Sequence, residues 1–383
     1  MDIHEIQKVK VFREYSMFAK EIGAINLSQG IPEPLMDCTI NHHLKESLHH
    51  GWAYTDTRGI KELRESICND YANDFKPDEV LITSGGAESL YIAVTAAKEL
   101  YGNKIAFISP FFPFYKSLSL IFNLEALSVP MLKNTNTLTP DFAQLENLFK
   151  QGVKTFILNT PHNPSGWTLN LTEAGLLRNL LDKYGVLLIV DEVYRHYVYN
   201  EAIEEEAAIK ILYQDNKHIL ILGSASKLLS ATGMRVGWLI GDNKLLNIPY
   251  AMHSHTSHCQ PAPFQHAIAA ILNNPDKSWF QAIKEHYQKK RDKLITALRE
   301  IGFKCYDVDG GHFILAEYAN LSAEKYSDIF ARDFARKHGI LPLTTNVFYD
   351  NNCAKQEVRF SLTATMNLID ATVTKLTNST DKS

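Results

Sequence analysis

Lys227 is the residue with the clearest catalytic potential in this sequence. It ends the tetrapeptide Ser224-Ala225-Ser226-Lys227, which follows the strand-like run 218–222 (HILIL). A lysine in a cleft loses hydration, which lowers the pKa of its amine and makes it a nucleophile toward a carbonyl carbon. Two alternatives stand beside this hypothesis. Ser-x-x-Lys is also the nucleophile motif of penicillin-binding proteins, but their Ser-Asp-Asn and Lys-Thr-Gly tripeptides do not occur here. A solvated loop lysine is the ordinary case.

Asp191 is the second candidate, because it follows the aliphatic run 186–190 (VLLIV). A carboxylate that is buried by such a run needs a cation or a hydrogen-bond donor as its partner. We expect a protonated ring nitrogen in that position, although a helix N-cap or a structural ion pair fits the sequence equally well. Tyr194 follows three residues later and adds a phenolic donor on the same side of the turn.

Three further positions are suited to anions. Ser84-Gly85-Gly86-Ala87-Glu88 closes one run and opens a helical pattern, so its backbone N–H groups suit a phosphate, although an ordinary turn explains it too. Ser224, Ser226 and the nearby Arg235 suit the same phosphate. Arg359 lies in the apolar run 357–361 (EVRFS) and calls for a planar anion such as a carboxylate, with an internal salt bridge as the alternative.

Metal binding is not indicated. His253, His255 and His258 lie close together, but no Cys/His/Asp quartet with fitted spacing accompanies them, so we expect a polar loop and treat zinc as a weak alternative. His42-His43 and His49-His50 look like exposed helix positions. Five cysteines without a C-x-x-C pair indicate neither a disulfide framework nor a zinc site.

The polar clusters share one feature: each follows a short apolar run. The runs are 80–83, 105–109, 155–159, 186–190 and 218–222, and helical spacing separates most of them. Such alternation predicts a doubly wound, mostly parallel sheet, and ligands bind at the carboxyl edge of its strands. Five clusters at one edge predict one site. After Gln265 the pattern changes to long charged helices (278–301, 322–338) around short strands (312–317, 357–361), which predicts a smaller α+β layer.

The chemistry that these residues require belongs to one cofactor. A phosphate, a protonated pyridine nitrogen, a phenolic oxygen and an imine-forming carbonyl all occur in pyridoxal phosphate (PLP), and an amino-acid substrate supplies the carboxylate. Composition excludes other classes. The chain has 383 residues with 39 Lys+Arg against 43 Asp+Glu, a net charge of −4, so it lacks the basic excess of a nucleic-acid or membrane-surface protein. The polar start and the absence of long apolar runs favour a cytoplasmic protein without membrane spans.

From about residue 25 to 362 the chain resembles the class I/II aminotransferases of PLP fold type I, the aspartate aminotransferase superfamily. The segments that carry the resemblance are INLSQGIPEP (25–34), YTDTRGIKELR (54–64), TSGGAESL (83–90), NTPHNPSG (159–166), DEVY (191–194), SASKLLSATGMRVGW (224–238), GGHF (310–313) and VRFS (358–361). The branch of methionine and kynurenine aminotransferases looks most similar. The resemblance implies a large PLP-binding domain (46–275) with a mostly parallel seven-stranded sheet, and a small α+β domain (276–383) that residues 1–45 join.

The resemblance also implies a role for each matching residue. Lys227 would form the Schiff base and move the proton, Asp191 would hold the pyridinium, and Asn163 and Tyr194 would hydrogen-bond the ring hydroxyl. The remaining expected contacts fall into four groups. Gly86, Ala87, Ser224 and Arg235 would bind the phosphate, and Tyr115 would stack on the ring. Tyr54 would reach the partner subunit's phosphate in a homodimer with shared sites. Arg359, together with Gly30, Ile31 and Asn163, would bind the substrate.

The expected activity is transfer of an amino group from an L-amino acid to a 2-oxo acid by a ping-pong mechanism. No arginine lies between Arg235 and Arg291, where aspartate aminotransferases carry the one that binds a side-chain carboxylate, so methionine, aromatic or other apolar donors are favoured. Phe112, Phe114, Phe313 and Phe348 would line that pocket, with plain core packing as the alternative. A C–S β-lyase or a decarboxylase of the same fold is the second hypothesis. A transcription regulator would need a DNA-binding segment, and a relic without turnover would not need Lys227.

Overall fold

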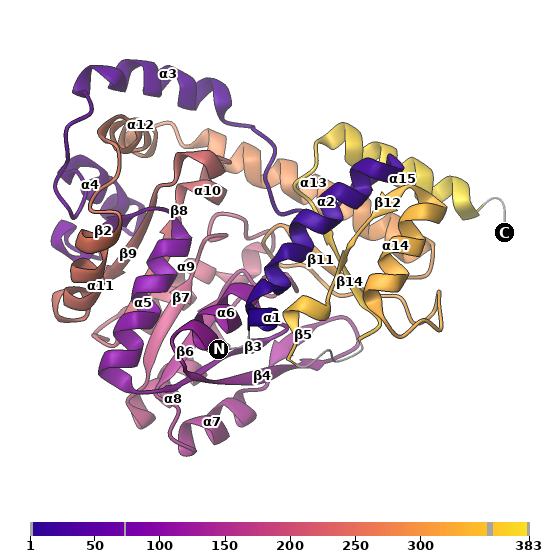
Figure 1. Ribbon diagram of the computed structural model, residues 1–383, viewed down its shortest axis with the longest axis horizontal. Helices are drawn as coiled ribbons and strands as arrows, with labels where there is room; N and C mark the ends of the chain where they lie inside the picture. The colour runs from indigo at the N-terminus through magenta and orange to yellow at the C-terminus, as the bar shows by residue number, and fades with distance from the viewer. Residues whose placement is uncertain (1–2, 73, 351–354, 381–383) are drawn as a thin grey trace.

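The computed structural model describes residues 3–72, 74–350 and 355–380 of the 383-residue chain. A large sheet with helices on both faces fills one side of the molecule, and a smaller α+β layer lies on the other side (Figure 1). The α/β class and the mostly parallel large sheet are confirmed.

The large sheet has the strand order β2-β9-β8-β7-β6-β3-β4-β5. The central strands β8, β7, β6, β3 and β4 are parallel to one another, whereas β9 runs antiparallel to both β8 and β2. The described residues form eight strands here rather than the expected seven, because the short β5 pairs antiparallel with the end of β4. The bounds are β2 Val80–Thr83, β3 Lys104–Ser109, β4 Glu125–Lys133, β5 Leu138–Pro140, β6 Thr155–Asn159, β7 Leu187–Asp191, β8 Ile219–Ser224 and β9 Gly237–Gly241.

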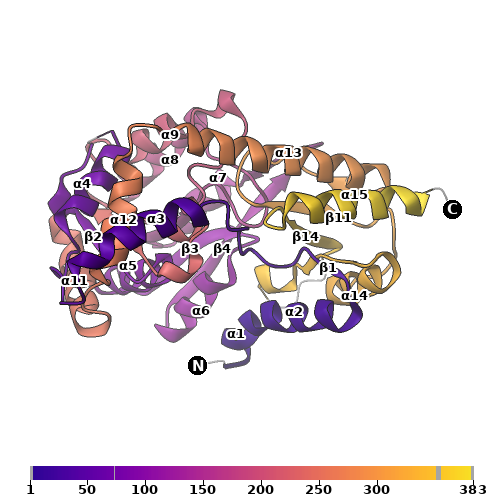
Figure 2. The ribbon, with the colours of Figure 1, turned by 90° about the horizontal axis from the view of Figure 1, so that it is seen from above.

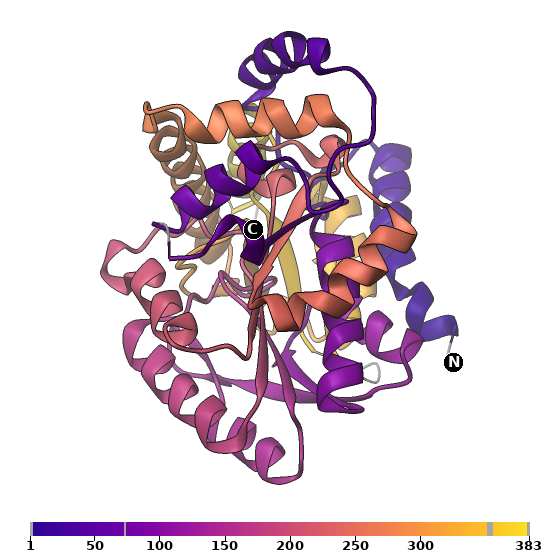
Figure 3. The same ribbon diagram turned by 90° about the vertical axis from the view of Figure 1, so that its left-hand side faces the viewer.

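Alternating side chains cover the two faces of this sheet. In β7, Leu187 and Ile189 pack into one apolar cluster, and Leu188 and Val190 pack into the other, as the two-residue period of a strand requires. Helices α5, α6 and α11 supply one cluster, and α4, α7, α8, α9 and α12 supply the other (Figure 3). Burial on both faces explains why these strands are continuous apolar runs in the sequence.

The helices of the large unit have these bounds: α3 Asp37–Ser47, α4 Lys61–Asp70, α5 Gly86–Tyr101, α6 Pro113–Ile121, α7 Phe142–Lys150, α8 Leu171–Tyr184, α9 Glu205–Tyr213, α10 Ala225–Leu228, α11 Asn243–Thr256 and α12 Ala262–Asn273. Helix α11 corrects one expectation. His253 and His255 lie on this helix rather than in a loop, because Asp242 caps its start by accepting a hydrogen bond from the Lys244 backbone N–H, and the helix continues through Pro249.

The smaller layer is built on a four-stranded antiparallel sheet with the order β10-β11-β14-β13. Its strands are β10 Lys304–Cys305, β11 Phe313–Glu317, β13 Leu343–Thr344 and β14 Glu357–Ser361, and its helices are α13 Ser278–Glu300, α14 Ser327–His338 and α15 Met366–Thr380. Helix α14 begins later than expected. Gln356 donates to the carbonyls of Ser322 and Glu324, which are therefore not available to a helix at 322–326.

The N-terminal segment lies beside this smaller layer. Helices α1 (Ile3–Gln7) and α2 (Val11–Ile22) lead into β1 (Ile25–Asn26), which pairs in parallel with β12 (Ile340–Leu341) (Figure 2). The next helix, α3, packs instead on α12 of the large unit. The division at residues 45 and 275 stays a prediction. No helix of the described ranges has the length and apolarity needed to cross a membrane.

Candidate active site

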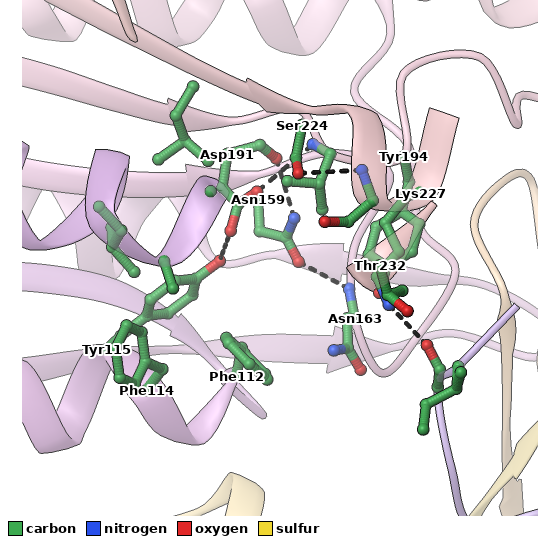
Figure 4. A pocket seen from close by; sticks show the side chains of 18 of the residues that line it. Phe112, Phe114, Tyr115, Asn159, Asn163, Asp191, Tyr194, Ser224, Lys227 and Thr232 are labelled. Atoms are coloured by element: carbon green, nitrogen blue, oxygen red, sulfur yellow. Dashed lines mark hydrogen bonds between the residues drawn. The ribbon is translucent and has the colours of Figure 1, made fainter. Parts of the chain in front are cut away.

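A cavity of about 410 Å³ lies at the carboxyl ends of the central strands, between the large sheet and residues 30–31. Twelve of the thirteen predicted site residues line it, and Tyr54 does not. Figure 4 shows Asp191 from the end of β7 together with Ser224 and Lys227 from the end of β8 and the helix that follows it. The expectation that five separated clusters meet at one sheet edge is therefore confirmed as a matter of geometry.

Asp191 ends β7 at the floor of the cavity and is buried. Its Oδ2 accepts a 2.7 Å hydrogen bond from the Tyr115 hydroxyl, and its Oδ1 accepts a longer one, 3.4 Å, from the Val193 backbone N–H. Burial raises the pKa of Asp191 from 3.8 to about 6, and these hydrogen bonds oppose the rise only in part. The carboxylate has no cation in hydrogen-bond contact among the described residues, so it is suited to a protonated ligand nitrogen.

Lys227 lies in the short helix α10, and its Nζ donates a 2.5 Å hydrogen bond to the Gly30 carbonyl across the cavity. Burial, with the positive charge of Arg359 as the second cause, lowers the pKa of the Lys227 amine from 10.5 to about 8. A lysine that loses its proton near pH 8 presents a nucleophilic amine at neutral pH far more often than a solvated lysine does.

One end of the cavity is built for an anion. Helix α5 begins at Gly86, so the N–H groups of its first turn have no partner within the helix and its dipole is positive there. The Arg235 guanidinium lies beside this turn and donates to the carbonyls of Ser84 and Thr232. A Cβ on Gly85 would come within 2.8 Å of that guanidinium, at a φ of +80°, so only glycine allows the approach.

Arg359 lies in β14 at the opposite end of the cavity and is 1% exposed. Its Nη2 donates to the Ser28 carbonyl at 2.7 Å and its Nη1 to Asn163 Oδ1 at 3.0 Å, while its Nε has no partner. No carboxylate of the described residues pairs with it, which rules out the internal salt bridge within those ranges. Its charge is instead flanked by the Phe313 ring, at 3.9 Å from the guanidinium carbon to the ring centroid.

Tyr115 lines the cavity, and the ring-stacking role expected of it stays a prediction. Its hydroxyl is bonded to Asp191, its ring packs edge-on against Phe112 with centroids 5.8 Å apart, and its side chain is 2% exposed. The hydrogen bond fixes the Tyr115 ring beside the Asp191 carboxylate. Phe112 is partly exposed and lines the same cavity, as Figure 4 shows, so it is a second candidate for a ring-stacking contact.

Tyr54 and the histidines lie outside the cavity. Tyr54 is 84% exposed and contacts the His258 ring edge-on at 5.2 Å. His253 is buried and its Nδ1 lies 3.1 Å from Glu88 Oε1. Within residues 3–72, 74–350 and 355–380, the only group of three potential metal ligands is His42, His43 and Glu46, on the outer surface of α3. In that part of the chain, His253, His255 and His258 do not come together as a group of potential metal ligands.

Sequence analysis missed several residues of the cavity. Asn159, the last residue of β6, donates from its amide to the Asp191 carbonyl at 2.9 Å and accepts from the Asn163 backbone N–H at 2.8 Å, so it joins the two loops. Because Asn159 directly precedes TPHNPSG at a strand end, the sequence could have indicated it as a site residue. Phe12 and Thr232 also line the cavity, but Phe12 comes from an N-terminal helix that no pattern connects with the site.

A family model matches the chain over most of its length. Residues 23–376 fit the model of aminotransferase class I and II. The chain belongs to this family. It is 28% identical to the probable N-succinyldiaminopimelate aminotransferase of Mycobacterium tuberculosis, over 89% of this chain and 86% of that protein. It is 26% identical to the methionine aminotransferase of Escherichia coli, over 88% and 87% of the two chains. Kynurenine–oxoglutarate transaminase 3 of Homo sapiens is 27% identical over 82% and 73%.

Solved structures agree with this membership. The structure of the M. tuberculosis N-succinyldiaminopimelate aminotransferase superposes with a TM-score of 0.88 at 27% identity, covering 96% of both chains. A Thermus thermophilus aspartate aminotransferase gives a TM-score of 0.86 at 19% identity over 96% of both chains, which shows a shared fold. The three sequence relatives are all named as aminotransferases, which favours amino-group transfer over the lyase and decarboxylase alternatives.

Members of this family use pyridoxal phosphate, and the cavity fits it. The anion end at Gly86 and Arg235 suits the phosphate, the unpaired carboxylate of Asp191 suits the ring N–H, and the amine of Lys227 suits the carbonyl carbon. In the described chain, no anion pairs with Arg235, and no cation is hydrogen-bonded to the Asp191 carboxylate, so both groups are available to the cofactor.

Proposed function

We propose that this aminotransferase takes its amino group from L-amino acids with apolar side chains, methionine and aromatic residues above all, and passes it to a 2-oxo acid in a ping-pong cycle. The observation that carries the proposal is Arg359. It is a buried guanidinium without a carboxylate partner in the described residues, in the same cavity as the amine of Lys227. A substrate α-carboxylate supplies the missing anion, and a bidentate pair would fix the orientation of the substrate.

Each protein group has a defined task in such a cycle. The bound cofactor supplies an electron-accepting ring that weakens the bonds at the substrate Cα. Asp191 would keep a proton on the ring nitrogen, because its buried carboxylate is stabilised by a positively charged N–H group beside it. The Nζ amine of Lys227 would accept and donate the proton that moves at the substrate Cα. Arg359 holds the carboxylate, so that the Cα–H bond faces Nζ.

The walls of the cavity support the apolar side-chain class. The apolar side chains that line the cavity include Phe12, Ile31, Phe112 and Phe313, and the cationic residues that line it are Lys227, Arg235 and Arg359. Each of these three cations already has a task on the cofactor or the α-carboxylate. A side-chain carboxylate would therefore be buried against aromatic rings without a counter-ion, at a cost of several kcal/mol.

A homodimer with shared sites is part of the proposal. Tyr54 and Trp52 are 84% and 72% exposed and follow α3, a placement that suits contact with a second copy. In such a dimer the Tyr54 hydroxyl would reach the phosphate of the other subunit. A cytoplasmic location stays a prediction from the sequence.

A donor screen tests the proposal. Protein loaded with pyridoxal phosphate is mixed with single L-amino acids and 2-oxoglutarate or pyruvate, and the new amino acid is quantified. We expect methionine, phenylalanine and kynurenine to give the highest kcat/KM, with aspartate at least tenfold lower, and double-reciprocal plots that stay parallel as the acceptor is varied. Highest activity with aspartate would contradict the apolar class. Pyruvate and ammonia formed from a cysteine conjugate without an acceptor would favour the β-lyase alternative.

A further inference from the structure

Residues 28–33 (Ser-Gln-Gly-Ile-Pro-Glu) form one wall of the cavity, and we call them the strap. Their backbone carbonyls hold the residues that act on the substrate. Ser28 O accepts from Arg359 Nη2 at 2.7 Å, and Gly30 O accepts from Lys227 Nζ at 2.5 Å. The position of the strap therefore determines where the Arg359 guanidinium lies, and it brings a backbone carbonyl to the Lys227 amine.

The far end of the strap is anchored by Glu33. Its backbone N–H donates to the Thr363 carbonyl at 3.1 Å. Its Oε1 accepts a hydrogen bond from Lys290 Nζ, and His286 Nε2 lies 2.5 Å from the same oxygen. Lys290 also donates to the Ala364 carbonyl at 2.7 Å. These contacts join the strap to α13 and to the segment after β14.

Lys290 is an unusual anchor because its side chain is 0% exposed, and that of Glu33 is only 10% exposed. Burial lowers the pKa of Lys290, and the Glu33 carboxylate opposes that change. A buried ammonium that loses its carboxylate is strongly destabilised, so the pair tolerates little displacement of either partner. The ion pair Lys293–Asp370 on the same helix, by contrast, has two partners that are about half exposed, so it constrains little.

We propose that Glu33 and Lys290 are a positioning pair, which fixes the strap so that Ser28 O holds the Arg359 guanidinium where it binds the substrate α-carboxylate. The inference rests on the proposed function, because it assigns the α-carboxylate to Arg359. Neither Glu33 nor Lys290 lines the cavity, so both act through the strap. The pair should affect substrate affinity more than the rate of the chemical steps.

Four variants test the pair in cofactor-loaded protein: Glu33→Gln, Lys290→Met, the double variant Glu33→Leu/Lys290→Met, and Lys293→Gln as a matched control on the same helix. The dissociation constant of 3-phenylpropionate, a carboxylate without an amino group, is measured by calorimetry, beside KM, kcat, Tm and amide exchange at 28–33. We expect each single variant to raise the dissociation constant and KM at least about tenfold, to change kcat less than threefold, and to speed exchange in the strap.

The double variant separates positioning from stability. Replacing both charges by apolar groups should return the Tm toward that of the wild type, because no unpaired charge stays buried, while the affinity for 3-phenylpropionate stays low. Recovery of affinity together with Tm, or an equal loss in Lys293→Gln, would overturn the proposal. If no amino acid reacts with the wild-type protein, the proposed function fails, and the exchange data alone then decide whether the pair fixes the strap.

Discussion

Asp191→Asn should stabilise the protein when no cofactor is bound. The Asp191 carboxyl is buried, and burial raises its pKa from 3.8 to about 6. At about 1.4 kcal/mol for each pH unit, the charged carboxylate costs the folded state about 3 kcal/mol. Because the folded-state pKa is raised, the folded protein binds the proton more tightly than the unfolded chain does. Stability is therefore full below pH 4 and is lost as the pH rises to 6. An asparagine does not titrate, so the variant avoids this loss.

The assay is urea unfolding of cofactor-free protein between pH 4 and 8. We expect the two proteins to unfold with similar free energy near pH 4 and the variant to be more stable by about 3 kcal/mol at pH 7 and above. Pyridoxal phosphate should reverse the order, because the ring N–H pairs with a carboxylate better than with an amide. A constant difference across the pH range, or a variant that is less stable at pH 7 without cofactor, would refute the argument that Asp191 is an unpaired buried carboxylate.

Three further substitutions follow from the same contacts. Tyr115→Phe removes the 2.7 Å hydrogen bond to Asp191, a charge-assisted bond worth about 1.5–3 kcal/mol. The pKa of Asp191 should therefore be higher in this variant, and in the same urea assay its loss of stability should extend about one to two pH units higher than that of the wild-type protein. Arg359→Gln should lower kcat/KM for amino acids at least about 30-fold (about 2 kcal/mol) and leave the slow reaction of an amine without a carboxylate unchanged; an equal loss for both would place Arg359 elsewhere in the cycle. Lys227→Met should stabilise cofactor-free protein at pH 7, because the pKa of Lys227 is lowered to about 8. The wild-type protein gains stability as the pH rises from 8 to 10.5, so the difference should close there, and a difference that does not change with pH would count against the lowered pKa.

The position of the site was predictable from the sequence because it depends on local patterns. Buried parallel strands are continuous apolar runs, so Asp191 and Ser224 were recognisable as residues at strand ends. Parallel strands end at one edge, and this placed five clusters together without any knowledge of their contacts. Arg359 was also predictable as a site residue, because a charge buried in an apolar strand costs free energy unless an anion binds it.

Contacts between side chains that are far apart in the sequence were not predictable. Tyr115 and Asp191 are joined by a hydrogen bond across 76 residues, and nothing in PFFPFY shows whether its ring or its hydroxyl faces the cavity. Glu33 and Lys290 are 257 residues apart, and both belong to residue types that are usually solvated. The prediction of a loop at 253–258 is wrong for its first four residues, because a Ser/Thr-rich segment is typical of loops, whereas helix α11 continues to Thr256.

The central claim is that the amine of Lys227 binds the carbonyl carbon of pyridoxal phosphate in this cavity. Borohydride reduction of the cofactor-loaded protein, followed by peptide mass mapping, tests it most directly. We predict one modified site per chain, on the peptide that contains Lys227, and no fixed cofactor in Lys227→Met. Fixed cofactor on another lysine, or equal labelling of the Lys227→Met protein, would contradict the account.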